Sequence, residues 1–314
     1  MTANSTPSPN PKKRRRRWFA LLAVAAVPFG IWLFAWWLSG NFPHGSRPLP
    51  KNARYVRRTD IDYLDGAAPA SQRQRLDLYV PFGLGETAAP IVGLLHGGGW
   101  ASGDRRQCGE VAAWLAERGV IAAAIDYRVR PFVAAADLPW DAARATVWLH
   151  RHAAQIHGDP QRIFLLGHSA GGQLAALIAA DRKYLDALGA PPNVPAGVVP
   201  VSAPFDLRDI SSTRRWATRL TIGFAFDSDL PFRWSMSPLA HVRPGLPPFL
   251  IIRGAEDPFV TQPEAEAMAA AIRAAGGSAN TVTAPGRSHI AVFVLMPQPG
   301  DQAAAAVLRF VTAR

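Results

Sequence analysis

The sequence predicts an α/β fold, in which a mostly parallel, eight-stranded sheet carries helices on both faces. From about residue 54 onward, short apolar runs with strand character alternate with longer helical patterns. Alternation of this kind favours a parallel sheet that is covered on both faces by helices. The chain has 314 residues, of which 49% are hydrophobic and 18% charged, so it is long and apolar enough for one large globular domain.

Eight segments have the short apolar or alternating pattern of strands, namely residues 55–64, 75–80, 91–96, 120–127, 163–167, 197–202, 249–253 and 280–284. Five have a helical pattern, namely residues 108–117, 140–157, 170–184, 263–275 and 302–312. The first two strands have no helix between them, so we expect them to form an antiparallel edge. Between residues 204 and 248 the alternation gives way to polar turns and aromatic residues, which predicts a small cap insertion above the carboxyl edge of the sheet.

The N-terminal part of the chain differs from the rest in charge and hydropathy. Residues 1–58 contain eleven basic side chains and no Asp or Glu, which equals the net charge of +11 and leaves the remainder formally neutral. The basic excess therefore does not indicate a nucleic-acid-binding face. Residues 18–38 form an uncharged, apolar run of 21 residues, long enough to cross a bilayer as a helix. We expect a basic disordered tail over 1–17, a transmembrane anchor over 18–38, a linker over 39–53 and the globular domain over 54–314.

The apolar run is either a retained anchor or a cleaved signal peptide. It is longer than a typical signal segment and no small-x-small cleavage site clearly follows it, which favours the anchor. Six basic residues precede the run directly and five are spread over the twenty residues after it, which orients the N-terminus to the cytoplasm. We expect a single-pass protein of the cell (inner) membrane with an extracytoplasmic domain, in a bacterium a periplasmic one. The sole cysteine, Cys108, cannot form an internal disulfide and does not identify the compartment.

Ser169 lies in the run Gly167-His168-Ser169-Ala170-Gly171, between a buried strand and a helix. The Gly-x-Ser-x-Gly pattern in a strand–turn–helix context predicts a sharp turn that exposes the serine hydroxyl at the open end of the sheet. The N-terminus of the following helix and the backbone N–H of Ala170 favour an anion at the same place. The alternative is a plain glycine-rich turn of a parallel sheet, so the other residues must decide.

A second glycine-rich run, His96-Gly97-Gly98-Gly99-Trp100, directly follows the apolar strand that ends near Leu95. Three glycines allow the backbone to turn its N–H groups inward, where together with Ala170 they could hold a tetrahedral oxyanion. A phosphate-binding loop is the alternative. No Lys-Ser/Thr pair follows, which disfavours it.

An acid and a base are expected on the loops after the last two strands. Asp257 and His289 each follow a strand at its carboxyl end, where open α/β sheets place their ligands. With Ser169 they appear in the order Ser, Asp, His. Glu256 and Asp206 are alternative acids. His168 is expected to order backbone rather than act as a base, because adjacent positions on a turn do not easily bring its ring to the Ser169 hydroxyl.

These features resemble the α/β-hydrolase superfamily, and within it the carboxylesterases with an HGGG-type oxyanion motif. That group includes hormone-sensitive-lipase-like esterases and the related arylformamidase- and feruloyl- or acetyl-esterase-like enzymes. The resemblance extends from about residue 55 to the C-terminus and does not include the apolar N-terminal run. Besides the motifs above, it rests on Asp126-Tyr127-Arg128, on His157-Gly158-Asp159-Pro160, and on Ser237-Pro238 through Pro247-Pro248.

The resemblance implies a serine carboxylesterase that acts on small or medium acyl or aryl esters without a metal or organic cofactor. Ser169 would be the nucleophile, His289 the base, Asp257 the acid that orients it, and Gly98, Gly99 and Ala170 the oxyanion donors.

Trp100 and the aromatic residues of the cap, namely Phe205, Trp216, Phe224, Phe226, Phe232 and Trp234, either line an apolar substrate pocket or pack the cap itself. Two other functions remain open: an arylformamidase or other amide hydrolase with the same triad, and an inactive scaffold on a hydrolase fold. The expected partners are a small-molecule ester and, through the N-terminal helix, a membrane. No nucleic acid is expected, and the sequence does not indicate an oligomeric state.

Overall fold

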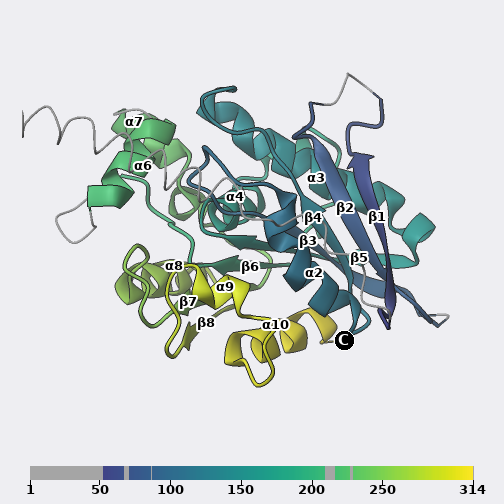
Figure 1. Cartoon of the computed structure of the whole chain (residues 1–314). Coiled ribbons are helices and arrows are strands. Elements are labelled where there is room, and N and C mark those ends of the chain that lie inside the picture. Colours follow the sequence, from purple (N-terminus) through teal and green to yellow (C-terminus); the bar gives the residue numbers. More distant parts are fainter. Residues whose placement is uncertain (1–51, 67–70, 86, 209–215, 227–228, 314) are drawn as a thin grey trace, which may run out of the picture.

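The computed structural model describes residues 52–66, 71–85, 87–208, 216–226 and 229–313. They form an eight-stranded sheet in the order β1-β2-β4-β3-β5-β6-β7-β8 (Figure 1). The strands are β1 (Tyr55–Asp62), β2 (Arg75–Pro81), β3 (Ala89–Leu95), β4 (Ile121–Ile125), β5 (Gly158–His168), β6 (Gly197–Val201), β7 (Phe249–Gly254) and β8 (Ala279–Ala284). Each predicted strand segment coincides with one of them.

Strand direction follows the predicted pattern. β1 pairs antiparallel with β2, so the predicted antiparallel edge is confirmed, and β2 is also antiparallel to β4. From β4 to β8 every pairing is parallel. The carboxyl ends of β3, β5, β6, β7 and β8 therefore lie at one edge of the sheet, and the loops that follow them are neighbours in space.

The helices are α2 (Gly109–Ala116), α3 (Leu138–His152), α4 (Ala170–Ala180), α5 (Lys183–Asp186), α6 (Trp216–Phe226), α7 (Leu230–Ser235), α8 (Gln262–Ala274), α9 (Ala291–Val294) and α10 (Gln302–Thr312). The 3-10 turns are η1 (Arg105–Cys108), η2 (Ala135–Asp137), η3 (Ala154–Ile156) and η4 (Pro238–His241). All five predicted helices are present. The predicted helix 170–184 is divided into α4 and α5 because Asp181 takes an extended conformation, with φ −92° and ψ 91°.

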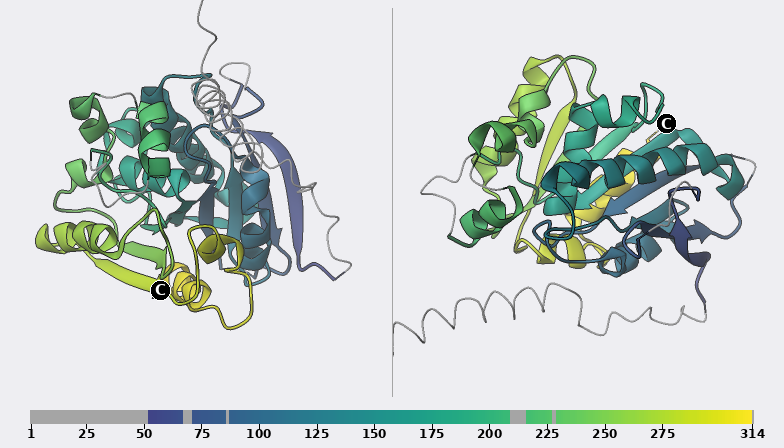
Figure 2. Two further views of the ribbon diagram at one scale, coloured as in Figure 1. Left: turned by 60° about the vertical axis from the view of Figure 1, so that its left-hand side comes forward. Right: turned by 90° about the horizontal axis from the view of Figure 1, so that it is seen from above.

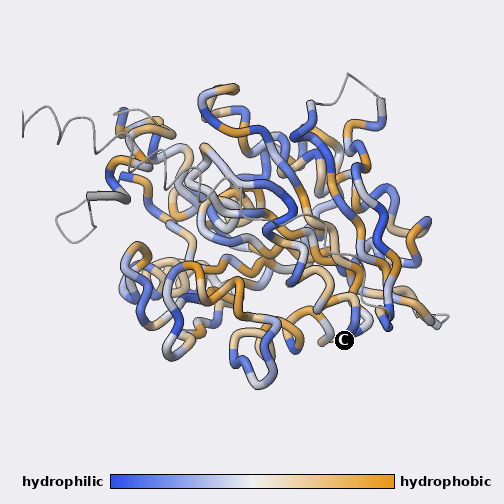
Figure 3. The backbone as a smooth tube through the Cα atoms, in the orientation of Figure 1, coloured by the Kyte–Doolittle hydropathy of each residue, from blue (hydrophilic) through white to orange (hydrophobic). Residues whose placement is uncertain are grey.

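Two layers of helices cover the sheet. α3, α4, α5 and α8 contribute to the hydrophobic core on one face, and α2, α9 and α10 contribute to the core on the other (Figure 2). β3, β4 and β6 are buried along their whole length, as expected for strands that are covered on both sides. In Figure 3 the central strands are mainly hydrophobic, and hydrophilic residues lie mostly on the outer loops.

The segment between β6 and β7 leaves the regular alternation, as predicted for residues 204–248. In its described part it forms the helices α6 and α7 and the 3-10 turn η4. Figure 1 shows α6 and α7 standing outside the layers on the sheet, beyond α4. We call this segment the cap.

The N-terminal regions predicted as tail, anchor and linker fall almost wholly on residues 1–51, which are outside the described residues. Across the part of the chain that the structure does describe, no helix is both long enough and apolar enough to span a membrane.

Candidate active site

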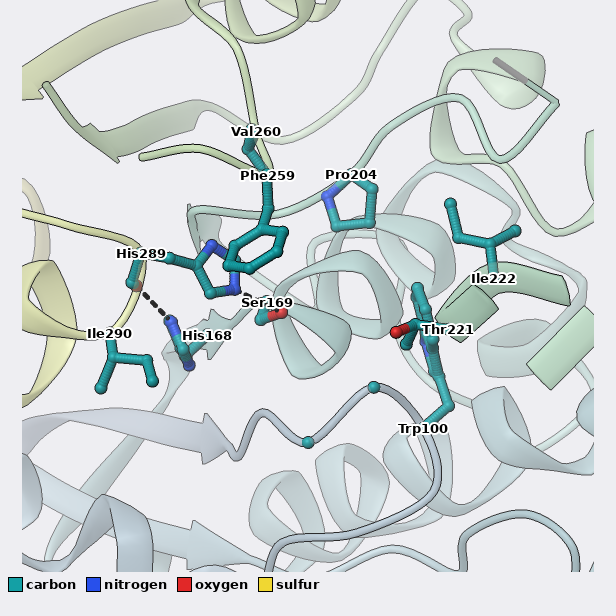
Figure 4. A pocket seen from close by; sticks show the side chains of 12 residues that line it. Trp100, His168, Ser169, Pro204, Thr221, Ile222, Phe259, Val260, His289 and Ile290 are labelled. Atoms are coloured by element: carbon teal, nitrogen blue, oxygen red, sulfur yellow. Dashed lines mark hydrogen bonds between the residues drawn. The ribbon is translucent and has the colours of Figure 1, made fainter. Parts of the chain in front are cut away.

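A pocket opens at the carboxyl edge of the sheet and contains most of the predicted site residues. Its walls come from the loops after β3, β5, β6, β7 and β8 and from α6 of the cap. The lining residues are Gly98, Gly99, Trp100, His168, Ser169, Pro204, Thr221, Ile222, Phe259, Val260, His289 and Ile290 (Figure 4). The loops after five strands and one helix of the cap therefore meet where the sequence predicted the site.

Ser169 occupies a strained turn between β5 and α4. Its backbone has φ 52° and ψ −117°, which a residue with a side chain rarely adopts. The two sides of the turn lie so close together that a Cβ at Gly167 would be 2.3 Å from the Gly171 oxygen, which is why a glycine is needed there. The Ser169 N–H donates to Val201 O at 2.8 Å, which ties the turn to the end of β6. The serine hydroxyl is thereby held in the pocket.

The glycine loop, Gly97 to Gly99, follows β3. The carbonyl oxygens of Gly97 and Gly98 are hydrogen-bonded on one side of this loop, and the N–H groups of Gly98 and Gly99 point to the other side. His96 Nδ1 lies 2.7 Å from Gly97 O, and the Gly98 carbonyl accepts from Ala101 N, Ser102 N and Ser102 Oγ at 2.9–3.1 Å. In a trans peptide the N–H points opposite to the C=O, so the N–H groups of Gly98 and Gly99 are turned to the other side. Both glycines line the pocket. A third donor is close by, since Ala170 begins α4 and its N–H has no acceptor one turn earlier in the helix.

His289 links the serine to an acid. Its Nε2 lies 2.9 Å from Ser169 Oγ, and its Nδ1 lies 2.9 and 3.1 Å from the two oxygens of Asp257. The Asp257 side chain is fully buried and accepts the backbone N–H groups of Phe259 and Val260. These contacts fix the carboxylate, which in turn selects the imidazole tautomer with the proton on Nδ1 and leaves Nε2 to accept from the serine.

Neither alternative acid lies in this arrangement. Glu256 is exposed, and its backbone N–H donates to Arg287 O on the adjacent loop. Asp206 forms an ion pair with Arg208 at 3.0 Å. Asp257 is the carboxylate that contacts His289.

Trp100 contributes to the pocket wall, but most of its contacts are internal. Its ring is only 3% exposed, packs edge-on against Phe226 and donates from Nε1 to Gln173 Oε1 at 2.9 Å. Gln173 in turn donates to Met236 O at 2.6 Å, so this chain of contacts joins the glycine loop, α4 and the cap.

The aromatic residues of the cap do not form the pocket wall where the structure describes them. Phe205 and Phe226 are buried in the core, Phe224 is 53% exposed, and Arg208 stacks on Trp234. The Trp216 side chain is outside the described part. The cap lines the pocket instead with Pro204, Thr221 and Ile222. No sequence pattern pointed to these three residues. Pro204 lies on the loop after β6, and the positions of Thr221 and Ile222 depend on how α6 packs.

Comparisons with known proteins identify the family of the chain. A family model named BD-FAE matches residues 76–272, which is more than half of the chain. The chain belongs to the BD-FAE family. The match includes the glycine loop, Ser169 and Asp257, and it ends before His289. The resemblance to α/β-hydrolase carboxylesterases that the sequence suggested is thereby confirmed.

Named relatives of this BD-FAE member are esterases. It is 28% identical to a probable isoprenylcysteine alpha-carbonyl methylesterase of Arabidopsis thaliana over 78% of this chain and 53% of the relative. It is 30% identical to esterase LipC of Mycobacterium tuberculosis over 76% of this chain and 61% of the relative. The chain thus matches only about half to three fifths of the length of these relatives.

A solved esterase structure is also similar. Thermogutta terrifontis esterase 2 phosphonylated by sarin aligns with a TM-score of 0.61 and 27% identity, and the alignment covers 77% of this chain and 87% of that one.

Proposed function

We propose that this BD-FAE family member is a serine carboxylesterase that hydrolyses small or medium acyl or aryl esters. The observation that carries the proposal is the series of short contacts from Ser169 Oγ through His289 to Asp257, beside the N–H groups of two glycines. Esterase names among the relatives support the same reaction class.

In the proposed reaction, His289 Nε2 takes the Ser169 proton while Oγ attacks the ester carbonyl carbon. The carbonyl oxygen becomes an oxyanion that accepts hydrogen bonds from Gly98, Gly99 and Ala170, each donor contributing on the order of 3 kcal/mol to the transition state. The bond to the alkoxy oxygen then breaks, and His289 returns the proton to the leaving alcohol. Water, activated by His289 in the same way, cleaves the acyl-enzyme and releases the acid.

The pocket has two sides, and the mechanism assigns one part of the ester to each. Figure 4 shows Phe259, His289 and Ile290 on one side of Ser169, and Thr221 and Ile222 on the other. The leaving oxygen must reach His289 Nε2 to be protonated, so the alcohol lies beside Phe259 and Ile290. The acyl group then extends toward α6.

The lining also supports a substrate without charge. Apart from His168 and His289, the described lining side chains carry no ionisable group. An ionised acyl or alcohol part would therefore lose its hydration without gaining a partner of opposite charge, which is costly.

The proposal is tested with full-length protein and with p-nitrophenyl acetate and butyrate. We expect Ser169→Ala to lower kcat by about 10⁴-fold or more. Ser278→Ala is the matched control, because Ser278 is an exposed serine that precedes β8 at the opposite edge of the sheet, and it should keep the wild-type kcat.

A second measurement follows the covalent step itself. A fluorophosphonate probe should add to the wild type and to Ser278→Ala, and mass spectrometry should locate the adduct on Ser169. Labelling or full turnover by Ser169→Ala would refute the proposed nucleophile. If well-folded wild-type protein showed neither labelling nor turnover, the esterase proposal would be refuted.

A further inference from the structure

The ring of His168 lies between the two loops that flank Ser169. Its Nε2 is 2.8 Å from the backbone oxygen of His289, a contact drawn as a dashed line in Figure 4. On its other edge, a Cβ added to Gly97 would lie 2.6 Å from His168 Nδ1, so the ring sits directly against the glycine loop. One side chain therefore contacts both the loop that carries the base and the loop that carries the proposed oxyanion donors.

Neighbouring aromatic rings hold the His168 ring in place. The residue is 9% exposed, and its ring stacks on Phe293 of α9 with a centroid distance of 5.2 Å and an interplanar angle of 19°. The His289 ring lies 5.0 Å away in a tilted arrangement. Because the acceptor at Nε2 is a carbonyl oxygen, this nitrogen carries the proton and donates it.

The contact acts on a part of His289 that Asp257 does not reach. Asp257 holds the imidazole ring through Nδ1, whereas His168 holds the main-chain carbonyl of the same residue. His289 lies on the loop between β8 and α9, where backbone freedom would displace the ring. A displacement of about 1 Å in such a site costs on the order of 100-fold in rate.

His168 also suits this place electrostatically. Burial lowers its pKa to about 3, with a further contribution from His289, while the His289 carbonyl and Asp257 act in the opposite direction. The ring therefore stays neutral at ordinary pH and places no positive charge beside His289 when that residue takes up the serine proton.

We propose that His168 is a positioning residue, whose Nε2–H anchors the His289 backbone and so keeps the imidazole within reach of Ser169. The proposal rests on the proposed esterase function. It assigns to the residue before the nucleophile a task that neither the serine nor the acid performs.

The test separates the hydrogen bond from the packing of the ring. His168→Leu and His168→Phe remove the donor and keep apolar volume, and His168→Gln keeps an N–H donor at a similar reach. With the full-length protein and p-nitrophenyl butyrate, we expect Leu and Phe to lower kcat by about 10- to 100-fold while KM changes by less than about twofold. His168→Gln should recover most of the kcat.

His152→Leu is the matched control. His152 also places a ring nitrogen against a backbone oxygen, with Nδ1 2.9 Å from Trp148 O, and it stacks on the Trp148 ring at 4.2 Å. It lies on α3, away from the pocket, so its replacement should leave kcat at the wild-type value. Two outcomes overturn the proposal: wild-type kcat in both His168→Leu and His168→Phe, or a loss in folded His168→Gln as large as in those two variants.

A measurement without turnover distinguishes this proposal from the esterase proposal. In ¹⁵N-histidine NMR of the full-length protein, the Nδ1–H of His289 that faces Asp257 should give a downfield proton signal. We expect it in the wild type and in His168→Gln, and we expect it to broaden through exchange with water in His168→Leu and His168→Phe. An unchanged signal in the latter two would overturn the positioning role even if the wild type hydrolysed no ester.

Discussion

Two opposing influences act on the Asp257 carboxyl group. Burial is the larger single influence and raises its pKa, but the hydrogen bond and charge of His289, with the Val260 N–H, together bring the pKa below its ordinary value. The group is therefore ionised at neutral pH, as required of the partner of a histidine that becomes positively charged during the proposed reaction.

Replacement of this carboxylate should affect turnover far more than folding. Asp257→Asn keeps the shape of the side chain but permits the wrong tautomer of His289, so we expect kcat to fall by about 10⁴-fold. Glu256→Gln removes a neighbouring exposed carboxylate and should leave kcat unchanged. Steady-state kinetics on p-nitrophenyl butyrate compares the two, and an equal loss in both variants would contradict the role of Asp257.

The same pKa has a consequence for stability. The pKa of the Asp257 carboxyl is about 4 in the unfolded chain and lower in the folded protein. The ionised carboxyl therefore stabilises the fold at pH values above about 4, and this stabilisation is lost as the pH falls through the folded pKa. The difference in free energy of unfolding between the wild type and Asp257→Asn should therefore be largest above about pH 5 and should shrink below about pH 4. Urea unfolding from pH 3 to 7 measures it, and a difference that grows toward low pH would count against the lowered pKa.

At the scale of single residues, the sequence predicted the side chains whose position follows from a strand end. Ser169, Asp257 and His289 each lie on a loop that follows the carboxyl end of a strand, so their meeting at one edge follows from the topology. The bond from His168 to the His289 backbone joins positions 121 residues apart, and no local pattern encodes it.

At the scale of elements, the eight strands and the helices α2, α3, α4, α8 and α10 were predictable because their periodicity matches their burial, whereas the short helix α9 was not predicted. α6 was not predicted. It contains Gly, β-branched and aromatic residues of modest helix propensity, and it is stabilised by burying Ile222, Ala225 and Phe226. Its pocket-facing side was therefore visible only in the folded structure.

This helix should set the acyl preference. Ile222 is 1% exposed and lines the acyl side of the pocket, so Ile222→Ala should raise the kcat/KM ratio of p-nitrophenyl hexanoate over acetate by about tenfold. Phe224→Ala is the matched control on the same helix, because Phe224 is 53% exposed, and it should leave the ratio unchanged. An unchanged ratio in folded Ile222→Ala would indicate that the acyl chain does not extend toward α6.

At the scale of the whole molecule, strand direction relates the N-terminus of the domain to the pocket. β1 is antiparallel to β2, and β2 is antiparallel to β4, so β1 runs in the same direction as the parallel strands. Tyr55 therefore begins at the edge opposite to the carboxyl edge where the pocket lies. The sequence predicts that residues 18–38 cross a membrane. We therefore expect the pocket, which lies at the edge opposite to Tyr55, to face away from the bilayer and to be open to esters dissolved in water.

The membrane prediction is tested on the full chain. We expect the wild type to remain with membranes through an alkaline carbonate wash, and Val24→Arg with Val27→Arg to release it, because each arginine at the centre of a membrane helix costs about 2.5–3.5 kcal/mol. In membranes whose catalytic side faces the medium, turnover of p-nitrophenyl acetate should be the same before and after the membranes are dissolved in mild detergent. Release of the wild type by carbonate would refute the anchor. Retention together with activity that appears only in detergent would instead show that the bilayer obstructs the pocket, against the orientation that β1 implies.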